Sequence, residues 1–267
     1  MIKRTNLVGN HTIPRLTNEL RNLTRRYEGW WNRWATDQDA HDKPNAPVFH
    51  YTSWDGFRGI MQSESFWLHS IFCMNDKTEL DYGWNISRDL LLQRNLAAHL
   101  SSDELVKVFC APQLAADRRL WLRQRFDFYS ISFGVRDDDR QWCTYGDKRR
   151  GVAVGLKPHL FSNVSKPAPA PEDKVYMARV LYGSSECTER HRLAIDFAFS
   201  ILEEARQRGL VRTDASGLAL VRTVATLMNV PLIWNSVTTK CATWRHEKEL
   251  RMLATNDLTR PDRKSVV

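Results

Sequence analysis

The stretch FDFYSISFG, from Phe126 to Gly134, decides how the fold is interpreted. Aromatic or apolar residues alternate in it with small polar ones, which is the pattern of a β-strand. Further strands are expected on both sides of it, at 48–51, 65–72, 151–158, 174–183 and 244–254. Helices fall between some of these strands but do not follow each one. This order predicts an α+β fold with a mixed or mostly antiparallel central sheet and flanking helices, rather than a doubly wound parallel sheet.

The expected helices are placed by capping residues and prolines. Thr52, Ser53 and Asp55 open a short helix directly after the first strand. A longer helix begins at Asn75 or Asp76, with Glu79 placed for a capping box, and continues to Leu100. Further helices are expected from Ser101 or Ser102 to a break at Pro112, at 114–125, near Trp142, at 186–207 and at 215–228.

The N-terminal region predicts an amphipathic helix. Its apolar residues follow one another at spacings of four and three, on one helix face: Leu16, Leu20, Leu23, Tyr27, Trp30 and Trp34. We interpret this face as a packing surface; the alternative is that Trp30, Trp31 and Trp34 contact a partner or a second copy in a homodimer. The polar stretch 36–47, with two prolines, is predicted to be a linker. The expected organisation is a helix and linker at 1–47, an α+β domain at 48–255 and a charged tail at 256–267.

The composition is that of a folded, basic protein. Of 267 residues, 42% are hydrophobic and 10% aromatic, enough for one large domain with a sizeable core. The formal net charge of +8 favours anionic partners, such as nucleic acid, a nucleotide cofactor or an acidic protein surface, without choosing among them. The sequence contains neither GxGxxG nor a P-loop, which disfavours Rossmann and nucleoside-triphosphatase folds.

The cysteines indicate a reducing compartment, and the hydropathy indicates no membrane segment. There are five cysteines, none close to another in sequence, so neither a disulfide framework nor a zinc knuckle is indicated. The N-terminus lacks an apolar run of signal-peptide length, and no stretch approaches about 20 apolar residues. We therefore expect a cytoplasmic protein with no membrane partner.

Two of the predicted strands carry side chains suited to chemistry. The stretch HYTS places His50 and Tyr51 where a strand ends and a helix begins, and the first amides of a helix point outward unpaired. In YSISFG, Ser130 and Ser132 share one face of the strand. Taken alone, His50 is equally a core histidine satisfied by backbone, and the serines are ordinary strand residues.

A third stretch, EKELR, places Glu247, Glu249 and Arg251 on one face of the predicted last strand. Two carboxylates in this arrangement repel each other unless cations or a ligand offset the repulsion. Arg245 and Arg251 are close enough in sequence to do so, which would make the pair a solvated sheet face rather than a site.

The order of these motifs resembles a bacterial family catalogued as domain of unknown function 2971. The order is H-Y-T-S before a glycine-containing helix, then M-N-D-x-x-E, S-I-S-F, W-x-x-Y-G, G-V-A-V-G and a late E-x-E-x-R. The resemblance covers 48–254 and leaves the N-terminal helix outside. It implies no settled activity.

A more distant similarity is to ADP-ribosyltransferases, whose core strands carry a His or Arg, then a Ser-x-Ser or Tyr element, then a Glu or Glu-x-Glu. It implies an ADP-ribosyltransferase-like fold with NAD as cofactor. Carried over by position, it makes Glu249 the catalytic carboxylate and Glu247 its substrate-facing partner, while His50 hydrogen-bonds the nicotinamide-side ribose. The remaining NAD-binding residues implied are Tyr51 or Tyr145, stacking on nicotinamide, with Thr52, Ser130, Ser132 and Arg58.

The chemistry that this similarity implies needs no metal. Breaking the nicotinamide–ribose bond develops positive charge on the sugar, which a carboxylate stabilises. Nicotinamide leaves with its own electrons. The diphosphate of NAD would need cations, for which Arg58, Lys148, Arg149 and Arg150 are candidates. The acceptor would be a protein, a nucleic acid or water, the last making the chain an NAD glycohydrolase; a toxin or phage-defence (antiviral) role is expected from the company such families keep.

Two other classes of function stay open at this point. A non-catalytic module that binds nucleic acid or protein would account for the charge of +8, the Arg-flanked tryptophan helix and the KRR at Lys148–Arg150. A metal-dependent hydrolase would use His50, Asp76, Glu79 and His246, although their spacing matches no established ligand signature.

Overall fold

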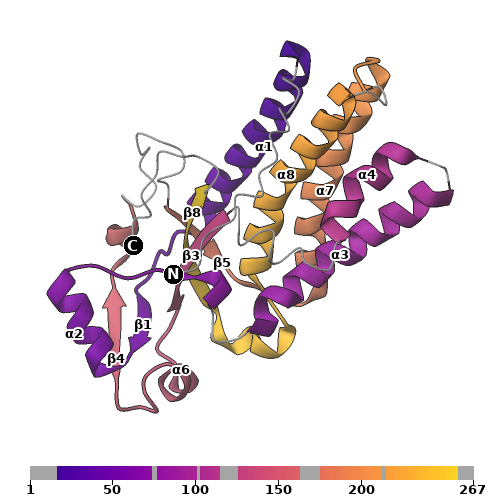
Figure 1. Ribbon diagram of the computed structural model, residues 1–267. Helices are drawn as coiled ribbons and strands as arrows, with labels where there is room; N and C mark the ends of the chain where they lie inside the picture. The colour runs from indigo at the N-terminus through magenta and orange to yellow at the C-terminus, as the bar shows by residue number, and fades with distance from the viewer. Residues whose placement is uncertain are drawn as a thin grey trace, which may run out of the picture.

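A computed structural model gives the fold of the chain, with long helices gathered to one side of a sheet (Figure 1). It describes residues 17–73, 77–100, 103–114, 126–162, 175–211 and 215–257. The helices are α1 (Asn18–Asp42), α2 (Trp54–Ser63), α3 (Lys77–Leu100), α4 (Glu104–Leu114), α6 (Asp139–Thr144), α7 (Ser184–Gln207) and α8 (Ala215–Val237), with 3₁₀ turns η1 (Ile71–Cys73), η2 (Pro158–Phe161) and η4 (Ala242–Glu247). The strands are β1 (Val48–Thr52), β2 (His69–Ser70), β3 (Phe126–Gly134), β4 (Val152–Leu156), β5 (Val175–Arg179), β6 (Leu181–Tyr182), β7 (Thr239–Lys240) and β8 (Glu249–Asp257).

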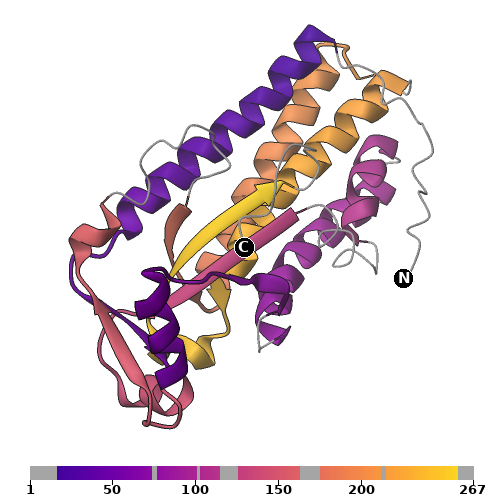
Figure 2. The same cartoon turned by 60° about the vertical axis from the view of Figure 1, so that its left-hand side comes forward.

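The stretch FDFYSISFG forms β3, in the middle of the main sheet. The strand order is β4-β1-β3-β8-β5, with β2 also paired to β3, and every pairing is antiparallel. β3 and β8 pair from Phe126 opposite Asp257 to Gly134 opposite Glu249, and Figure 2 shows them side by side. β6 and β7 form a separate two-stranded parallel sheet. The predicted α+β class with a mostly antiparallel sheet is confirmed.

The two faces of β3 point into different surroundings, because successive residues of a strand face opposite sides. Ile131 and Phe133 belong to an apolar cluster on one face. On the other face Phe128 joins a cluster that includes Trp234 of α8. The next residues on that second face are Ser130 and Ser132, so the apolar core ends there and a polar lining begins.

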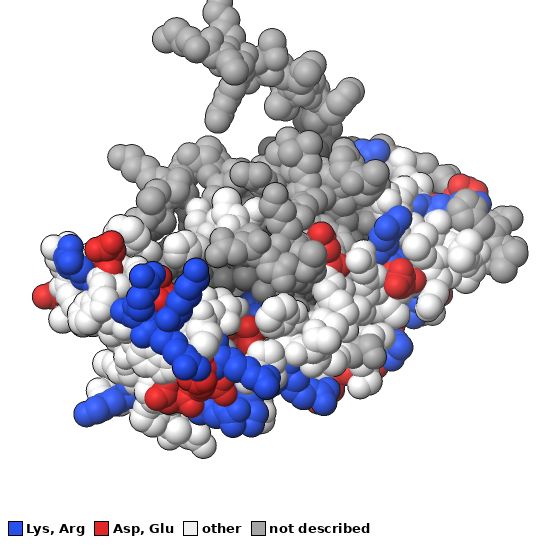
Figure 3. Space-filling model, turned by 90° about the horizontal axis from the view of Figure 1, so that it is seen from below, with Lys and Arg blue, Asp and Glu red and all other residues white. Residues whose placement is uncertain are grey.

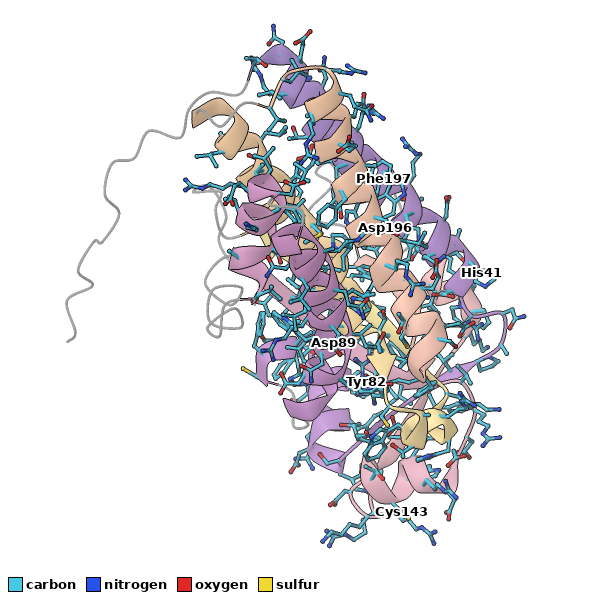
Figure 4. The ribbon with its side chains drawn as sticks, turned by 90° about the vertical axis from the view of Figure 1, so that its right-hand side faces the viewer. His41, Tyr82, Asp89, Cys143, Asp196 and Phe197 are labelled. Carbon is cyan, nitrogen blue, oxygen red and sulfur yellow. The ribbon has the colours of Figure 1, made fainter. Side chains whose placement is uncertain are left out.

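A third apolar cluster holds the helices together. It contains buried residues of α1, α3, α4, α7 and α8, among them Leu91, Ile201 and Met228. Figure 4 shows Asp89 on α3 and Asp196 on α7 within this helical layer, while Cys143 of α6 lies at the far end of the molecule. The helical layer therefore supports the sheet from one side and leaves α6 and the adjoining strand ends outside it.

The predicted linker at 36–47 is wrong over most of its length, because α1 continues to Asp42. The polar end of α1 is buried against the outer edge of β5. Asp39 accepts a hydrogen bond from the N–H of Met177 at 2.7 Å, and Asp42 accepts one from the N–H of Arg179 at 2.9 Å. The two carboxylates thus cover backbone donors that a bare sheet edge would offer to another chain.

The tryptophans of α1 pack within the chain, as the packing interpretation expected. The ring of Trp30 stacks on Phe197 of α7 with centroids 4.8 Å apart. Trp31 stacks on Trp34 and meets the edge of Trp234, at 5.1 and 5.6 Å. A partner or homodimer contact through these rings would have to replace the contacts they make here.

Several predicted boundaries are wrong at identifiable residues. α4 continues through Pro112 to Leu114, and α8 runs past the predicted end at 228, through Pro231, to Val237. All residues from Pro231 to Val237 are buried, so tertiary packing outweighs the hydrogen bond that a proline removes. The predicted strand at 65–72 is reduced to β2 and η1, and that at 174–183 divides between β5 and β6.

Other predictions fall outside the described residues. These are the caps at Asn75, Asp76, Ser101 and Ser102, the side chain of Glu79, nearly all of the helix at 114–125, and the end of the tail. The tail itself was placed too early, because β8 includes Asn256 and Asp257. The short helix at Trp142 and the strand of β4 are confirmed.

One helical stretch is apolar enough to cross a membrane, against the expectation that none approaches this length. Gly217–Val237 has 21 residues, and an 18-residue window within it has a mean hydropathy of 1.4. However, 67% of that window is buried inside the fold, and the core helix of a soluble protein has the same character. Its burial is the observation that favours a core helix.

Candidate functional site

A cavity of about 360 Å³ lies where the main sheet splits between β1 and β3. β1 is paired with β3 only at Phe49 opposite Gly134, while all five residues of β1 pair with β4. Further along the same edge of β3, β2 takes the place of β1, with His69 opposite Ser130. The strands therefore diverge beside the middle of β3, and β7, β8 and α6 complete the walls of the gap.

His50 reaches across this gap. Its Nδ1 lies 3.1 Å from the carbonyl oxygen of Ser132, and because a carbonyl only accepts, Nδ1 carries the hydrogen. Burial lowers the pKa of His50 below 6.5; the bond to Ser132 opposes this and the charge of nearby His69 adds to it. The imidazole is therefore neutral at pH 7, and its Nε2 is an acceptor with no partner in the described part of the chain.

The ring of His50 also has the packing of a core residue, as the plain alternative expected. It meets the rings of Phe66 and Phe133 edge-on, with centroids 5.5 and 5.9 Å away. One nitrogen is thus satisfied by backbone, the ring is held against two phenylalanines, and His50 is among the residues that line the cavity. This arrangement fixes the direction in which Nε2 points.

Glu249, the first residue of β8, is 7% exposed and lines the cavity. Arg251 binds both of its oxygens, from Nε to Oε1 at 2.8 Å and from Nη2 to Oε2 at 3.2 Å. Burial opposes ionisation of Glu249, but the charges and hydrogen bonds of Arg251 and Lys240 outweigh it and lower its pKa to about 2. At neutral pH this side chain is an ionised, firmly oriented carboxylate.

Lys240 holds the two glutamates of the site together. Its Nζ lies 2.6 Å from Oε2 of Glu247 and 2.6 Å from Oε2 of Glu249, and its side chain is buried. Pairing of β7 with β6, where Lys240 lies opposite Tyr182, fixes its backbone. Two carboxylates are therefore balanced by two cations, Lys240 and Arg251, in a group of four that carries no net charge.

The predicted strand position of Glu247 is wrong. Residues 242–247 form η4, and Lys248, with φ of 44°, turns the chain into β8. The turn nevertheless brings the Glu247 carboxylate into the cavity wall, where Oε1 accepts a hydrogen bond from the Tyr145 hydroxyl at 3.0 Å and Oε2 binds Lys240. Gln141 donates to the Glu247 carbonyl at 3.3 Å. With both oxygens occupied, Glu247 is poorly placed as a substrate-facing partner.

The two tyrosines that were candidates for stacking on nicotinamide, Tyr51 and Tyr145, differ in burial and in hydrogen bonding. The hydroxyl of Tyr51 donates to Asp137 at 2.9 Å and accepts from the N–H of Asp138 at 3.0 Å, which anchors the loop after β3. Burial is the main cause that raises the pKa of Tyr51 to about 12. Tyr145 is 46% exposed, and its hydroxyl is tied to Glu247. Tyr145 is therefore the better placed of the two to present a ring face to a ligand.

Seven of the predicted site residues line this one cavity. They are His50, Tyr51, Ser130, Ser132, Tyr145, Glu247 and Glu249. Thr52 and Arg58 do not line it; Arg58 is exposed on α2, with its Nη1 3.6 Å from the carboxylate of Asp55. Lys148, Arg149 and Arg150 are exposed in the turn after α6, where Arg149 binds Asp139 and Arg150 binds Asp147.

Sequence reasoning missed Lys240, His69, Gln141 and Cys73, which also line the cavity. Lys240 carries the clearest available signal, because it is a lone charge directly after the long apolar helix α8. His69 sits in an apolar stretch predicted to be a strand. The other two have no signal in a single sequence.

The metal-dependent alternative gains no support from the geometry. Among the described residues no group of three or more His, Cys, Asp or Glu side chains is arranged to hold a metal ion. Nδ1 of His246 lies 3.2 Å from the carbonyl oxygen of Thr243. Asp76 and the side chain of Glu79 lie outside the described residues.

Comparison with known proteins supports one of the two resemblances. A family model described as "Protein of unknown function (DUF2971)" matches residues 141–252. This range is narrower than the expected 48–254, but it carries Tyr145, Lys240, Glu247, Glu249 and Arg251 of the cavity. No curated protein and no solved structure matches the chain. None of these comparisons supports the similarity to ADP-ribosyltransferases.

Proposed function

We propose that the cavity is the active site of an NAD-consuming enzyme with ADP-ribosyltransferase-like chemistry. The observation that carries the proposal is the meeting of His50, Ser132 and Glu249, from three different strands, around one cavity. Its volume of about 360 Å³ is in the range of small-molecule sites. The nicotinamide and its ribose would enter the cavity, with the diphosphate directed toward the exposed cations after α6.

Glu249 supplies the charge that the reaction requires. Cleavage of the nicotinamide–ribose bond sends the bonding electrons out with nicotinamide, which leaves as a neutral ring, and positive charge develops on the ribose carbon. An ionised carboxylate beside that carbon stabilises it. Because the pKa of Glu249 is about 2, this residue acts through charge and hydrogen bonding and not as a proton donor.

One position on Glu249 remains for the substrate. A carboxylate has about four lone-pair positions. Arg251 and Lys240 occupy three of them through the bonds at 2.8, 3.2 and 2.6 Å. No described residue is shown bound to the fourth, on Oε1, which a ribose hydroxyl would take. Lys240 and Arg251 hold the carboxylate in place, but their positive charges also weaken its electrostatic attraction for the ribose carbon.

His50 would orient the ribose from the opposite wall. The sequence similarity implied a hydrogen bond between this residue and the sugar, and a neutral ring with hydrogen on Nδ1 gives that bond a direction. Nε2 accepts from a ribose hydroxyl and does not donate to it. The acceptor, or water, then forms the new bond to the ribose carbon, and its proton passes to solvent.

Release of nicotinamide from NAD tests the proposal. Purified protein is incubated with NAD, alone and with candidate protein or nucleic-acid acceptors, and nicotinamide is measured by chromatography. We expect release by the wild type and a rate lowered by roughly 100-fold or more in Glu249→Gln. The matched control is Glu28→Gln, an exposed glutamate of α1 away from the cavity, which should keep the wild-type rate.

Glu249→Gln leaves Arg251 and Lys240 short of a charged partner, so a second variant guards against misfolding. His50→Phe keeps an aromatic ring against Phe66 and Phe133 but removes Nε2, together with the Nδ1 bond to the Ser132 carbonyl. We expect it to lower the rate by roughly 10-fold or more while circular dichroism stays unchanged. Absence of nicotinamide release together with absence of NAD binding in calorimetry, or a wild-type rate in Glu249→Gln, would overturn the proposal.

Consumption of NAD would also give the chain its expected toxin or phage-defence role, because loss of the cofactor stops growth. Expression of the wild type should then lower cellular NAD, whereas expression of Glu249→Gln at the same level should not. Equal NAD levels in the two cultures would remove this role.

A further inference from the structure

We propose that single-stranded nucleic acid binds at the edge of the cavity, on a surface formed by α6, the turn at 145–150, η4 and Lys248. We call this surface the basic rim. The idea rests on the proposed function only in that the bound strand would supply the acceptor; binding itself does not require NAD. The charge of the whole chain, +8, suits such a partner.

The basic rim contains cations that no carboxylate of the described residues neutralises. Arg140, Lys148 and Lys248 are exposed and have no carboxylate partner among the described residues. Their elements are tied together, because the N–H of Val135 donates to the Lys248 carbonyl at 3.4 Å and Gln141 donates to the Glu247 carbonyl at 3.3 Å. Figure 3 shows Lys and Arg side chains gathered on the face where these elements meet.

Acidic side chains of the same face are already bound. The carboxylate of Asp137 accepts from the indole of Trp142 at 2.7 Å, and Asp138 binds Arg136 at 3.0 Å. Asp139 and Asp147 are paired with Arg149 and Arg150. Figure 3 shows acidic side chains among the basic ones on this face, and the bonds of these four aspartates leave Arg140, Lys148 and Lys248 to face a ligand.

Exposed aromatic rings belong to the same elements as these cations, Trp244 to η4 and Tyr145 to the turn at 145–150. Trp244 is 41% exposed, and its ring lies 6.1 Å from that of His246 at an angle of 35°. Tyr145, 46% exposed, borders both the rim and the cavity. Cations that follow a backbone, combined with rings on which bases stack, are the pattern of single-strand binding. In a duplex the base faces are stacked on one another and cannot stack on these rings. An acidic protein surface would use the cations but would not require the aromatic rings.

The test is binding of a fluorescent oligonucleotide of about 12 nucleotides, measured by anisotropy without NAD at several salt concentrations. The rim variant carries Arg140→Glu, Lys148→Glu and Lys248→Glu. The matched control carries Arg25→Glu, Arg88→Glu and Arg222→Glu, the same change of charge at exposed positions of α1, α3 and α8. Figure 4 shows the α3 part of the helical layer, marked by Asp89, well away from Cys143 of α6.

We expect the wild type and the control to bind with a steep salt dependence. Because each phosphate contact to a single strand contributes about 0.7 to the slope of log affinity against log salt, loss of three contacts should reduce that slope by about 2. Trp244→Ala should weaken binding by roughly 5- to 100-fold through loss of stacking. Duplex DNA and poly-glutamate should compete poorly.

Three results would overturn the inference: equal binding by the rim variant and the control, affinity that does not change with salt, or competition by poly-glutamate as strong as by the single strand. The last would indicate an acidic protein partner instead. Oligonucleotide binding without nicotinamide release would leave this inference standing and remove the proposed enzyme. Nicotinamide release without oligonucleotide binding would do the reverse.

Discussion

Substitution of Lys240 by Met tests the charge arrangement of the site most sharply. Lys240 Nζ is 2.6 Å from a carboxylate oxygen of each of Glu247 and Glu249, and all three side chains are at least nine-tenths buried. Met keeps most of the volume and removes the charge. Glu249 would then keep Arg251, and Glu247 would lose the cation that binds its Oε2.

The expected cost follows from this geometry. Removal of one partner from a buried ion pair destabilises a protein by about 3–5 kcal/mol, because the remaining charge is left without compensation. In domains of 150–250 residues, 1 kcal/mol corresponds to about 2–4 °C in Tm, so Lys240→Met should unfold roughly 6–20 °C below the wild type at pH 7.

Thermal unfolding followed by circular dichroism measures this effect. Lys157→Met, at an exposed lysine, should stay within about 0.5 kcal/mol of the wild type. Adding Glu247→Gln to Lys240→Met should restore about 1 kcal/mol or more, because Gln removes one carboxylate charge and still accepts from Tyr145. If Lys240→Met were as stable as the control variant at pH 7, Lys240 would not be bound to both glutamates in a buried group of four charges.

The remaining predictions concern Glu249, Asp39 and His50. The folded-state pKa of Glu249, about 2, lies below its ordinary value of 4.5. Ionised Glu249 therefore contributes about 3 kcal/mol to the free energy of unfolding above pH 4.5, and this contribution is lost as the pH falls toward 2. Stability should fall more steeply with acid in the wild type than in Glu249→Gln, and equal slopes would refute this. Asp39→Ala should cost about 1–3 kcal/mol, because the N–H of Met177 loses its acceptor, and hydrogen exchange at that amide should accelerate; unchanged protection would count against the contact. Nitrogen NMR of His50 should show hydrogen on Nδ1 and none on Nε2 at pH 7, and the opposite tautomer would contradict the bond to Ser132.

Local patterns predicted the elements of the fold well where packing and propensity agree. The alternation in FDFYSISFG identified β3 to the residue, and Ser53 correctly marked the start of α2 as its N-cap. The predictions failed where tertiary contacts reverse the local preference. Asp39 and Asp42 look like loop residues because they are polar, but they serve as acceptors for the edge of β5. Pro231 looks like a helix end, but the fully buried turn around it continues.

Part of the candidate site could be anticipated and part could not. Chemical type alone identified His50, Ser132 and Glu249, which line one cavity. Their meeting depends on the divergence of β1 from β3, which no period in the sequence encodes. The role of Lys240 depends on the pairing of β7 with β6 and on the turn at Lys248, both of which are long-range or conformational features. The predicted strand position of Glu247 failed for the same reason.

A crystal structure of the Glu249→Gln variant with NAD would show whether the cavity is an NAD site, because slowed cleavage would let the intact dinucleotide remain bound. We predict nicotinamide and its ribose inside the cavity, with a ribose hydroxyl within hydrogen-bond distance of His50 Nε2 and the reacting carbon facing residue 249. NAD bound elsewhere on the molecule, or an empty cavity at millimolar NAD with His50 and Arg251 in their present positions, would contradict it.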